Sequence, residues 1–149
     1  MNPDSRLLHL PQSSRYAVSA ALYLASVPAD GYHMVGKIAN SIGLSPSYLA
    51  KILQRLAQKG ILDSRRGAKG GYRLSRPAGE FTLSEIVAAS NRMDAGAMPC
   101  MIEARRCDCD KPCSMHEFVA STEGALWRRL NETTLANLGM SPFKQGEKK

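Results

Sequence analysis

Apolar residues recur at helical spacing through the first sixty positions of the chain, and they predict three helices. The first is expected over residues 13–25 and the second over residues 34–42. Ser45 and Pro46 suit the N-cap and the first position of a third helix, which we expect to end at Lys59. The apolar positions that define these faces are Ala17, Ala20, Ala21, Leu24, Val35, Ile38, Ile42, Ile52, Leu53 and Leu56.

Two short strand-like segments follow at residues 61–64 and 71–74, and they predict an antiparallel hairpin. The residues between them, 65–70, read Arg-Arg-Gly-Ala-Lys-Gly, so the tip of this hairpin is glycine-rich and positively charged. Thr82 and Glu85 have the spacing of a capping box, which indicates that a fourth helix begins there.

The last third of the chain changes from irregular to helical. Residues 94–113 lack any periodicity and hold all four cysteines, so we expect a loop. A long final helix is expected over residues 114–132, although Gly124 in its middle lowers the helix propensity. Its apolar residues, expected on one side, are Phe118, Val119, Leu126, Trp127 and Leu130.

Three helices followed by a basic hairpin is the element order of a winged helix-turn-helix. The predicted fold class is therefore mainly α, with a two-stranded β wing and a long C-terminal helix. We divide the chain into a DNA-binding domain at 1–80, a linking helix and cysteine-rich loop at 81–113, the long helix and its following segment at 114–138, and a disordered tail at 139–149.

The positive charge of the chain lies in its first half. Residues 1–79 contain eleven Lys and Arg against three Asp and Glu, whereas the remainder contains nine against ten. This asymmetry is typical of a protein whose first half faces phosphates, although a basic, well-solvated surface is the alternative. Charge alone therefore does not distinguish a nucleic-acid-binding surface from an ordinary basic surface.

The helix after the turn at Gly43 is the one that enters the major groove in this fold. Hydroxyl and amide side chains near its start can read base edges, whereas its Lys and Arg suit phosphates. In the hairpin, basic side chains supply charge, and glycines allow close approach to the sugar-phosphate backbone of DNA. The alternative is an ordinary hairpin whose glycines are needed only to form its turn. The predicted DNA-binding residues are Ser45, Ser47, Tyr48, Lys51, Gln54, Arg55, Arg65, Arg66, Lys69, Gly70, Gly71 and Tyr72.

Four cysteines and a histidine are crowded into the predicted loop and the residues just after it. They are Cys100, Cys107, Cys109, Cys113 and His116. Soft ligands this close together suggest a metal before a disulfide. Zinc sites usually have two to four residues between paired cysteines, whereas six, one and three residues separate the cysteines here. Iron-sulfur loops tolerate more varied spacing. A zinc site, a thiol redox switch and unligated cysteines remain alternatives to an iron-sulfur cluster.

Three segments resemble the IscR and NsrR branch of bacterial winged-helix regulators, in the BadM and Rrf-two family. They are Ser-Arg-Tyr-Ala-Val at 14–18, Leu-Ser-Pro-Ser-Tyr-Leu at 44–49 and Arg-Gly-Ala-Lys-Gly-Gly-Tyr at 66–72, and the resemblance extends over about residues 10–138. It implies a DNA-binding transcription regulator, expected to act as a repressor, that senses iron, redox or nitric oxide status. A thiol-based regulator and a zinc-stabilised DNA-binding protein are the alternatives.

The resemblance also implies a ligand set. In IscR-like members three cysteines and a nearby histidine hold a 2Fe-2S cluster, and Cys100, Cys107, Cys113 and His116 match them in order. Cys109 is an additional thiol, so either it or Cys107 is the middle ligand. NsrR-like members can take a ligand from an acidic residue near the start of the partner's first helix, where this chain has Ser13, Ser14 and Arg15. Arginine cannot ligate iron, so His116 is favoured, and a 4Fe-4S cluster is the alternative to 2Fe-2S.

The same resemblance makes the long helix a dimerisation helix, so two copies of the chain are expected to read a palindromic operator in double-stranded DNA. Ligation is expected to order the cysteine loop and to fix how the DNA-binding domains sit on the dimer. No membrane-spanning stretch or secretory signal is apparent, so a cytoplasmic location is expected. The chain lacks a nucleophile-base pair, Walker loop and dinucleotide fingerprint, so an enzyme is not expected.

Overall fold

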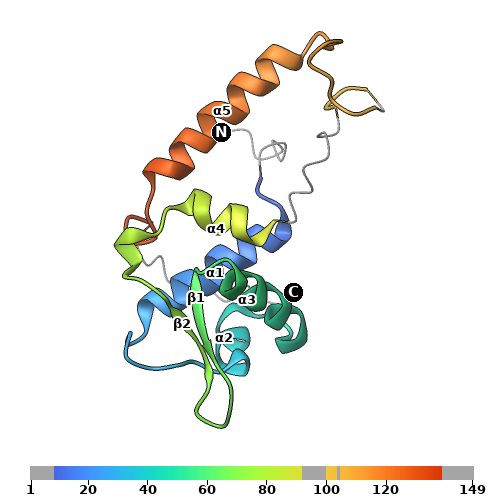
Figure 1. The fold of residues 1–149 in the computed structure, drawn as a ribbon. Coiled ribbons are helices and arrows are strands. Elements are labelled where there is room, and N and C mark those ends of the chain that lie inside the picture. The colour runs from blue at the N-terminus through green and yellow to red at the C-terminus, as the bar shows by residue number, and fades with distance from the viewer. Residues whose placement is uncertain (1–8, 92–99, 104, 139–149) are drawn as a thin grey trace, which may run out of the picture.

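The computed structural model describes residues 9–91, 100–103 and 105–138 of the chain, and this part is mainly helical (Figure 1). A helical body carries a β hairpin at one end, and a long helix stands away from the body at the other. In chain order the elements are α1 (Gln12–Ser26), α2 (Val35–Ile42), α3 (Pro46–Gln58), β1 (Leu62–Arg65), β2 (Gly71–Leu74), the 3-10 helix η1 (Ala78–Glu80), α4 (Leu83–Ser90) and α5 (His116–Glu132).

The core forms where the apolar faces of α1, α2, α3 and α4 meet. Alanines at positions 17, 20 and 21 are fully buried on α1, and their small side chains let the neighbouring helices pack closely. Larger side chains from the other helices and from the segment before α4 fill the remaining space. These fully buried residues include Ile38, Leu49, Leu53, Leu56, Phe81 and Ile86.

The predicted turn between α2 and α3 is confirmed in its details. Gly43 ends α2 with φ of 71°, a left-handed conformation that favours glycine. Ser45 caps α3 by accepting a hydrogen bond from the backbone N–H of Tyr48, and Pro46 occupies the first helical position. The chain therefore makes a sharp, sequence-encoded turn that fixes where α3 begins.

The hairpin pairs β1 with β2 in antiparallel register, from Leu62 opposite Leu74 to Arg65 opposite Gly71. A third segment, the connection between α1 and α2, joins this hairpin through two backbone hydrogen bonds between His33 and Tyr72, each 2.9 Å long. Because Tyr72 lies next to the tip in this register, these bonds tie the tip end of the hairpin to the body and fix its position relative to the helices.

Helix α4 begins at the predicted capping box, in which Thr82 and Glu85 satisfy each other's backbone N–H groups. Its other end is joined to α1 by buried hydroxyl groups: Ser90 donates to Ser14, and Ser14 donates to the side chain of Asn91. Ser14 therefore holds α1 and the end of α4 together inside the body.

Helix α5 is attached to the body at its C-terminal end. The backbone N–H of Leu83 bonds to the carbonyl of Thr133 and that of Leu135 to the carbonyl of Phe81, both at 2.9 Å. Leu130 and Leu135 are buried there, and Trp127 is packed against the core. Gly124 does not interrupt the helix. Within the described residues, no helix is both long and apolar enough to cross a membrane.

Some predicted boundaries and faces need correction. Helix α5 begins at His116 rather than at 114, and the apolar residues expected on one side of it are divided. Leu130 is buried, whereas Phe118 and Leu126 are 64% and 42% exposed, because only the last turns of α5 reach the body. Residues 94–99 of the expected loop and the expected tail at 139–149 lie outside the described residues.

Candidate nucleic-acid interface and cysteine loop

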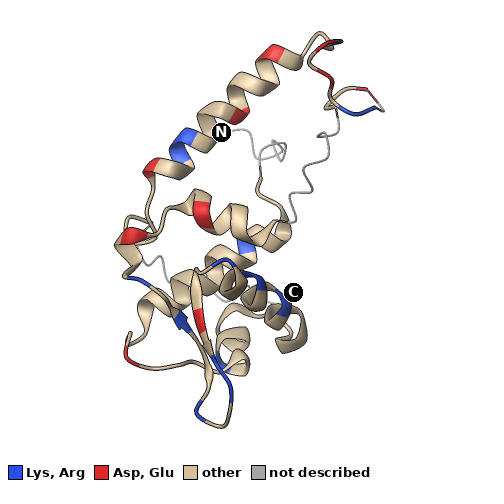
Figure 2. Cartoon of the chain, viewed as in Figure 1, with Lys and Arg blue, Asp and Glu red and all other residues tan. Residues whose placement is uncertain are grey.

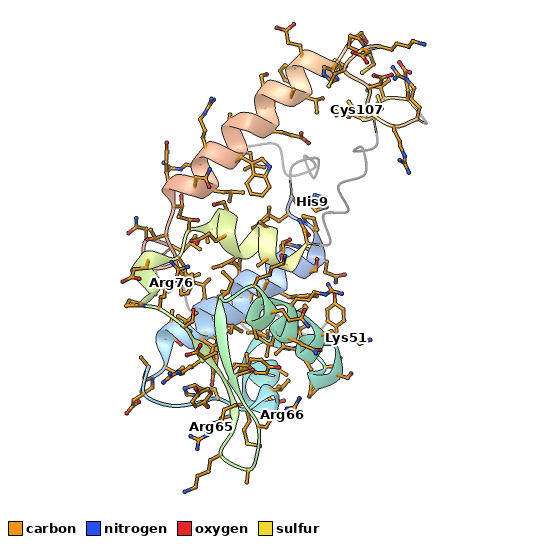
Figure 3. The ribbon with its side chains drawn as sticks, viewed as in Figure 1. His9, Lys51, Arg65, Arg66, Arg76 and Cys107 are labelled. Carbon is orange, nitrogen blue, oxygen red and sulfur yellow. The ribbon has the colours of Figure 1, made fainter. Side chains whose placement is uncertain are left out.

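Basic residues gather at the end of the molecule that carries the hairpin, while acidic residues lie mainly along α5 and the cysteine loop (Figure 2). Lys51 on α3 and Arg65 and Arg66 on the hairpin lie toward this same end (Figure 3). The basic half of the sequence therefore forms a basic surface at one end of the molecule, and the cysteine loop lies at the other end.

Helix α3 presents the predicted polar residues to solvent. Its opposite face is anchored in the core by Leu49, Ile52, Leu53 and Leu56. The side chain of Tyr48 packs edge-on against Tyr16 of α1, with ring centroids 5.9 Å apart, which braces the start of α3. The exposed residues on this surface are Ser45, Ser47, Tyr48, Lys51 and Gln54, and Arg55 is half-buried.

The tip of the hairpin is exposed and basic. Arg65, Arg66 and Lys69 are all exposed, and the N–H of Gly70 bonds to the carbonyl of Gly67 at 2.9 Å to close the turn. Gly67 has φ of 103°, which favours glycine. Three charges are therefore held on a short, well-defined turn next to α3, which is the chemistry needed to bind phosphates.

Gly70, Gly71 and Tyr72 make close contacts with other parts of the chain itself. A Cβ at Gly70 would overlap the carbonyl oxygen of Arg65, and one at Gly71 would overlap the carbonyl oxygen of His33. Tyr72 is half-buried and packs against the core. In the part of the chain that the structure describes, both glycines lie close to backbone atoms of other residues. They therefore shape the hairpin and hold it on the body.

Tyr32 is a residue of this surface that the sequence analysis missed. The guanidinium of Arg73 lies 4.8 Å from its ring centroid and that of Arg65 lies 6.0 Å away. Arg73 also donates two hydrogen bonds to Asp63, its partner across the hairpin. The Asp63–Arg73 ion pair can be predicted from the hairpin register, because the two residues lie opposite each other on the two strands. Nothing in the sequence pattern predicts that Tyr32 contacts the two arginines.

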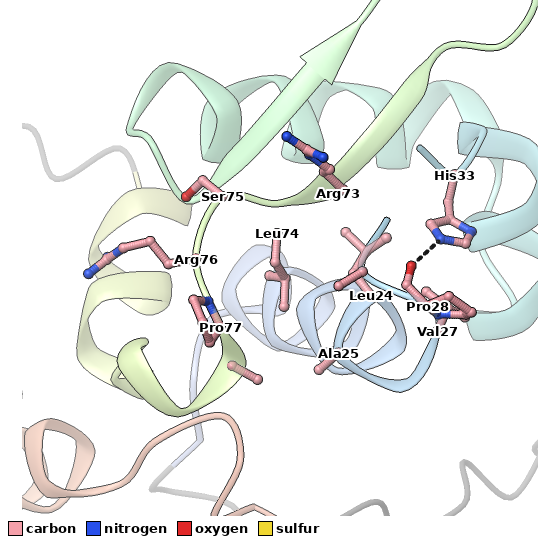
Figure 4. Close-up of a pocket in the computed structure, with 12 residues that line it drawn as sticks. Leu24, Ala25, Val27, Pro28, His33, Arg73, Leu74, Ser75, Arg76 and Pro77 are labelled. Carbon is pink, nitrogen blue, oxygen red and sulfur yellow. Dashed lines mark hydrogen bonds between the residues drawn. The ribbon is translucent and has the colours of Figure 1, made fainter. Parts of the chain in front are cut away.

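A pocket of about 350 Å³ lies between the end of α1 and the segment leaving β2 (Figure 4). Leu74 points into it, and the ring of His33 lies 3.4 Å from the carbonyl oxygen of Pro28 at its edge. Its two arginines already have acidic partners, since Arg73 pairs with Asp63 and Arg76 pairs with Glu85. The pocket therefore offers apolar walls and neutralised charges.

The cysteine loop brings its predicted ligands together as two pairs. The sulfur of Cys100 lies 3.6 Å from that of Cys113, and the sulfur of Cys107 lies 3.2 Å from Nδ1 of His116. His116 is the first residue of α5, so one of the two pairs includes the start of that helix. Cys109 is exposed, whereas Cys100, Cys107 and Cys113 are each partly buried.

Cys100 and Cys107 have different surroundings, which change the pKa values of their thiols in opposite directions. Backbone N–H groups of Glu103 and Ile102 hold the pKa of the Cys100 thiol below its ordinary value. Burial raises the pKa of the Cys107 thiol, and the neighbouring sulfurs at positions 100, 109 and 113 raise it further. The other three sulfurs therefore lie close enough to Cys107 to disfavour its thiolate.

Backbone contacts hold the loop around the thiols. Cys100 donates its N–H to the carbonyl of Arg105, and the guanidinium of Arg105 bonds to Glu103 and to the carbonyl of Lys111. The two donor pairs do not converge on one point: among the described residues, no three His, Cys, Asp or Glu side chains are placed to hold a single metal ion. The loop is thus arranged as two pairs rather than as a closed mononuclear site.

A family model described as Rrf2, iron-dependent transcriptional regulator, matches residues 10–140. The chain is 32% identical over 132 residues to the HTH-type transcriptional regulator IscR of Xenorhabdus nematophila, covering 89% of this chain and 74% of that protein. Among solved structures, CymR, the global cysteine regulator of B. subtilis, has a TM-score of 0.70 at 25% identity and covers 89% and 96% of the two chains. IscR of T. potens has a TM-score of 0.67 at 24% identity, covering 88% and 85%. The two likenesses confirm the predicted winged-helix fold.

Proposed function

This chain belongs to the Rrf2 family of transcriptional regulators, and we propose that it binds a palindromic DNA operator as a homodimer whose affinity is set by an iron-sulfur cluster. The observation that carries the cluster is the pairing of Cys100 with Cys113 and of Cys107 with His116. A regulator of this family needs no catalytic residues, and its relatives are transcription regulators rather than enzymes.

The donor set fits an iron-sulfur cluster by its chemistry. Three thiolates and one imidazole are soft ligands of the kind that hold such clusters, and four is the number that a cluster takes from the protein. Their arrangement as two pairs suits a two-iron cluster, in which each iron takes two protein ligands, so 2Fe-2S is favoured over 4Fe-4S. When bound, the cluster would supply a group that iron shortage, oxidants or nitric oxide can remove.

The DNA-binding part of the proposal is supported by the exposed face of α3 and the basic tip of the hairpin. Polar side chains at the start of α3 suit the edges of bases, and Lys51, Arg65, Arg66 and Lys69 suit phosphates on either side. Two copies of the chain would place two such surfaces about one helical turn of DNA apart, which is why the operator is expected to be palindromic.

Coupling between the loop and the DNA surface is supported by the position of α5. His116 at its first residue belongs to a donor pair, and the residues just after its end, Thr133 and Leu135, are hydrogen-bonded to the body. Capture of a ligand at one end would therefore fix the direction of a helix whose other end is fastened beside the DNA-binding domain. A typical coupling free energy of about 1–3 kcal/mol would change DNA affinity roughly 5-fold to 150-fold.

The proposal is tested by purifying the chain without oxygen and measuring iron, acid-labile sulfide and zinc together with the visible spectrum. We expect iron and sulfide in equal amounts, about two of each per chain, and a coloured protein. Zinc without sulfide would instead indicate a zinc-stabilised DNA-binding protein. A colourless protein without any metal would contradict the cluster and leave a thiol-based regulator or unligated cysteines.

A further inference from the structure

Cys100 and Cys113 lie at the two ends of the cysteine loop and face each other. The thiol of Cys100 donates to the sulfur of Cys113 across 3.6 Å, and the same Cys100 sulfur accepts the N–H of Glu103 at 3.4 Å. A disulfide bond is about 2.05 Å long, so the two sulfurs need to approach by only about 1.5 Å to form one. The folded loop thus already holds the thiols close to bonding position.

The other two cysteines have different neighbours. The sulfur of Cys107 is 3.2 Å from Nδ1 of His116, and Cys109 is exposed to solvent. Of the sulfur pairs in this loop, the pair at positions 100 and 113 is joined by a direct hydrogen bond in the described structure. Proximity therefore selects one disulfide out of the six pairings that four cysteines allow.

We propose that the iron-free chain forms a disulfide between Cys100 and Cys113 when it meets a hydroperoxide, and that this bond blocks cluster loading until it is reduced. The second half of the proposal rests on the proposed function, because the bond would consume two of the four cluster ligands. The loop would then have two alternative closures, one by iron and sulfide and one by a sulfur-sulfur bond.

The chemistry balances with hydrogen peroxide as the oxidant. The sulfur of Cys100 attacks one peroxide oxygen, so that an S–O bond forms, the O–O bond breaks, and a sulfenic acid and one water result. The sulfur of Cys113 then attacks the Cys100 sulfur, and the S–O bond breaks as the disulfide forms and a second water leaves. Two thiols lose two electrons and two protons, and one peroxide becomes two waters.

The experiment uses the full chain, stripped of iron by a chelator without oxygen, treated with one equivalent of hydrogen peroxide and then alkylated. Peptide mass mapping is expected to show a Cys100–Cys113 crosslink, with Cys107 and Cys109 alkylated. The double variant Cys107→Ser, Cys109→Ser should form the same crosslink. In Cys113→Ser, the Cys100 sulfenic acid should persist and be trapped by dimedone. A Cys107–Cys109 crosslink, a disulfide between two chains, or alkylation of all four thiols would overturn the proposal.

The cluster-loading half is measured separately on the same sample. The oxidised chain is expected to take up no iron and sulfide until dithiothreitol restores the thiols, whereas the untreated iron-free chain loads directly. Equal loading of the two samples would overturn this half. If the untreated chain never loads but the crosslink forms, the proposed cluster fails while the disulfide stands, so the two failures are distinguishable.

Discussion

Two cysteines separated by a single residue illustrate how much depends on individual side chains. Cys107 is partly buried and contacts the imidazole of His116, whereas Cys109 is exposed. The sequence left open which of them is the middle ligand, because their positions in the loop are almost equivalent. We propose Cys107 as the middle ligand, because of these two thiols it is the one that is partly buried and next to an imidazole donor.

This assignment predicts different outcomes for two matched substitutions. Cys107→Ser, purified without oxygen, should lose most of its iron and its visible absorbance, because a serine hydroxyl is a poor ligand for iron in such a cluster. Cys109→Ser should keep both. Iron analysis and the absorption spectrum of the two proteins measure the difference, and the reverse pattern would assign the ligand to Cys109.

The ring of Tyr32 contacts two hairpin arginines, Arg65 and Arg73, and we expect it to position them. Replacing it by alanine removes its cation-π contact with the predicted phosphate-binding Arg65, worth about 0.5–1 kcal/mol at an exposed site, so DNA affinity should fall about two- to fivefold. Tyr32→Phe keeps the ring and should bind DNA as the natural chain does. Titration of a DNA duplex checks both, and equal losses in both variants would mean that the hydroxyl acts instead.

At the scale of the elements, the sequence predicted the helices and the hairpin well. Caps with a clear chemical signal, such as Ser45 before α3 and the Thr82–Glu85 box before α4, placed helix starts correctly. What the sequence could not show was contact between distant segments. The bridge between His33 and Tyr72 and the buried Ser14–Ser90 bond depend on the packing of the whole body.

The same limit applies to the apolar side of α5 and to the candidate sites. Helical periodicity grouped Phe118 with Leu130, but it could not tell that only the last turns of the helix reach the body. The cysteine cluster was visible because its ligands are close in sequence. Its division into two pairs was not, since that depends on how the loop folds back on itself.

Two glycines should respond in opposite ways to replacement by alanine. Gly71 has φ of 138° and meets the backbone of His33, so Gly71→Ala should destabilise the fold by about 1–3 kcal/mol. Gly124 lies inside α5 with open space around it, so Gly124→Ala should stabilise by about 0.5–1 kcal/mol. Denaturant unfolding measures both, and an unchanged Gly71→Ala protein would show that the hairpin anchor is unimportant.

At the scale of the whole molecule, the cysteine loop and the basic surface lie at opposite ends of one chain (Figure 3). We expect a signal from one to the other to pass along α5 or through a second copy. Phe118 is exposed near the free start of α5, and Leu126 is exposed beside Trp127, which packs against the core. Such a surface on a family regulator supports the proposed dimer, with α5 as its contact.

Leu126→Glu should weaken this dimer, because it places a charge on a side chain whose burial is worth about 1.5–3 kcal/mol. The dimer dissociation constant should rise about tenfold or more, measured by sedimentation equilibrium. Asn131→Glu adds the same charge at another exposed position of α5 and serves as the matched control. Equal effects of the two substitutions would place the dimer contact elsewhere.

The most direct test of the whole account compares DNA binding by one preparation before and after its iron is removed. The chain is purified without oxygen, a DNA duplex is selected from a random pool by this protein, and both forms are titrated against that duplex at one fixed salt concentration. We expect iron and sulfide in the first form and dissociation constants that differ roughly 5-fold to 150-fold. Identical dissociation constants for the loaded and stripped forms would contradict it.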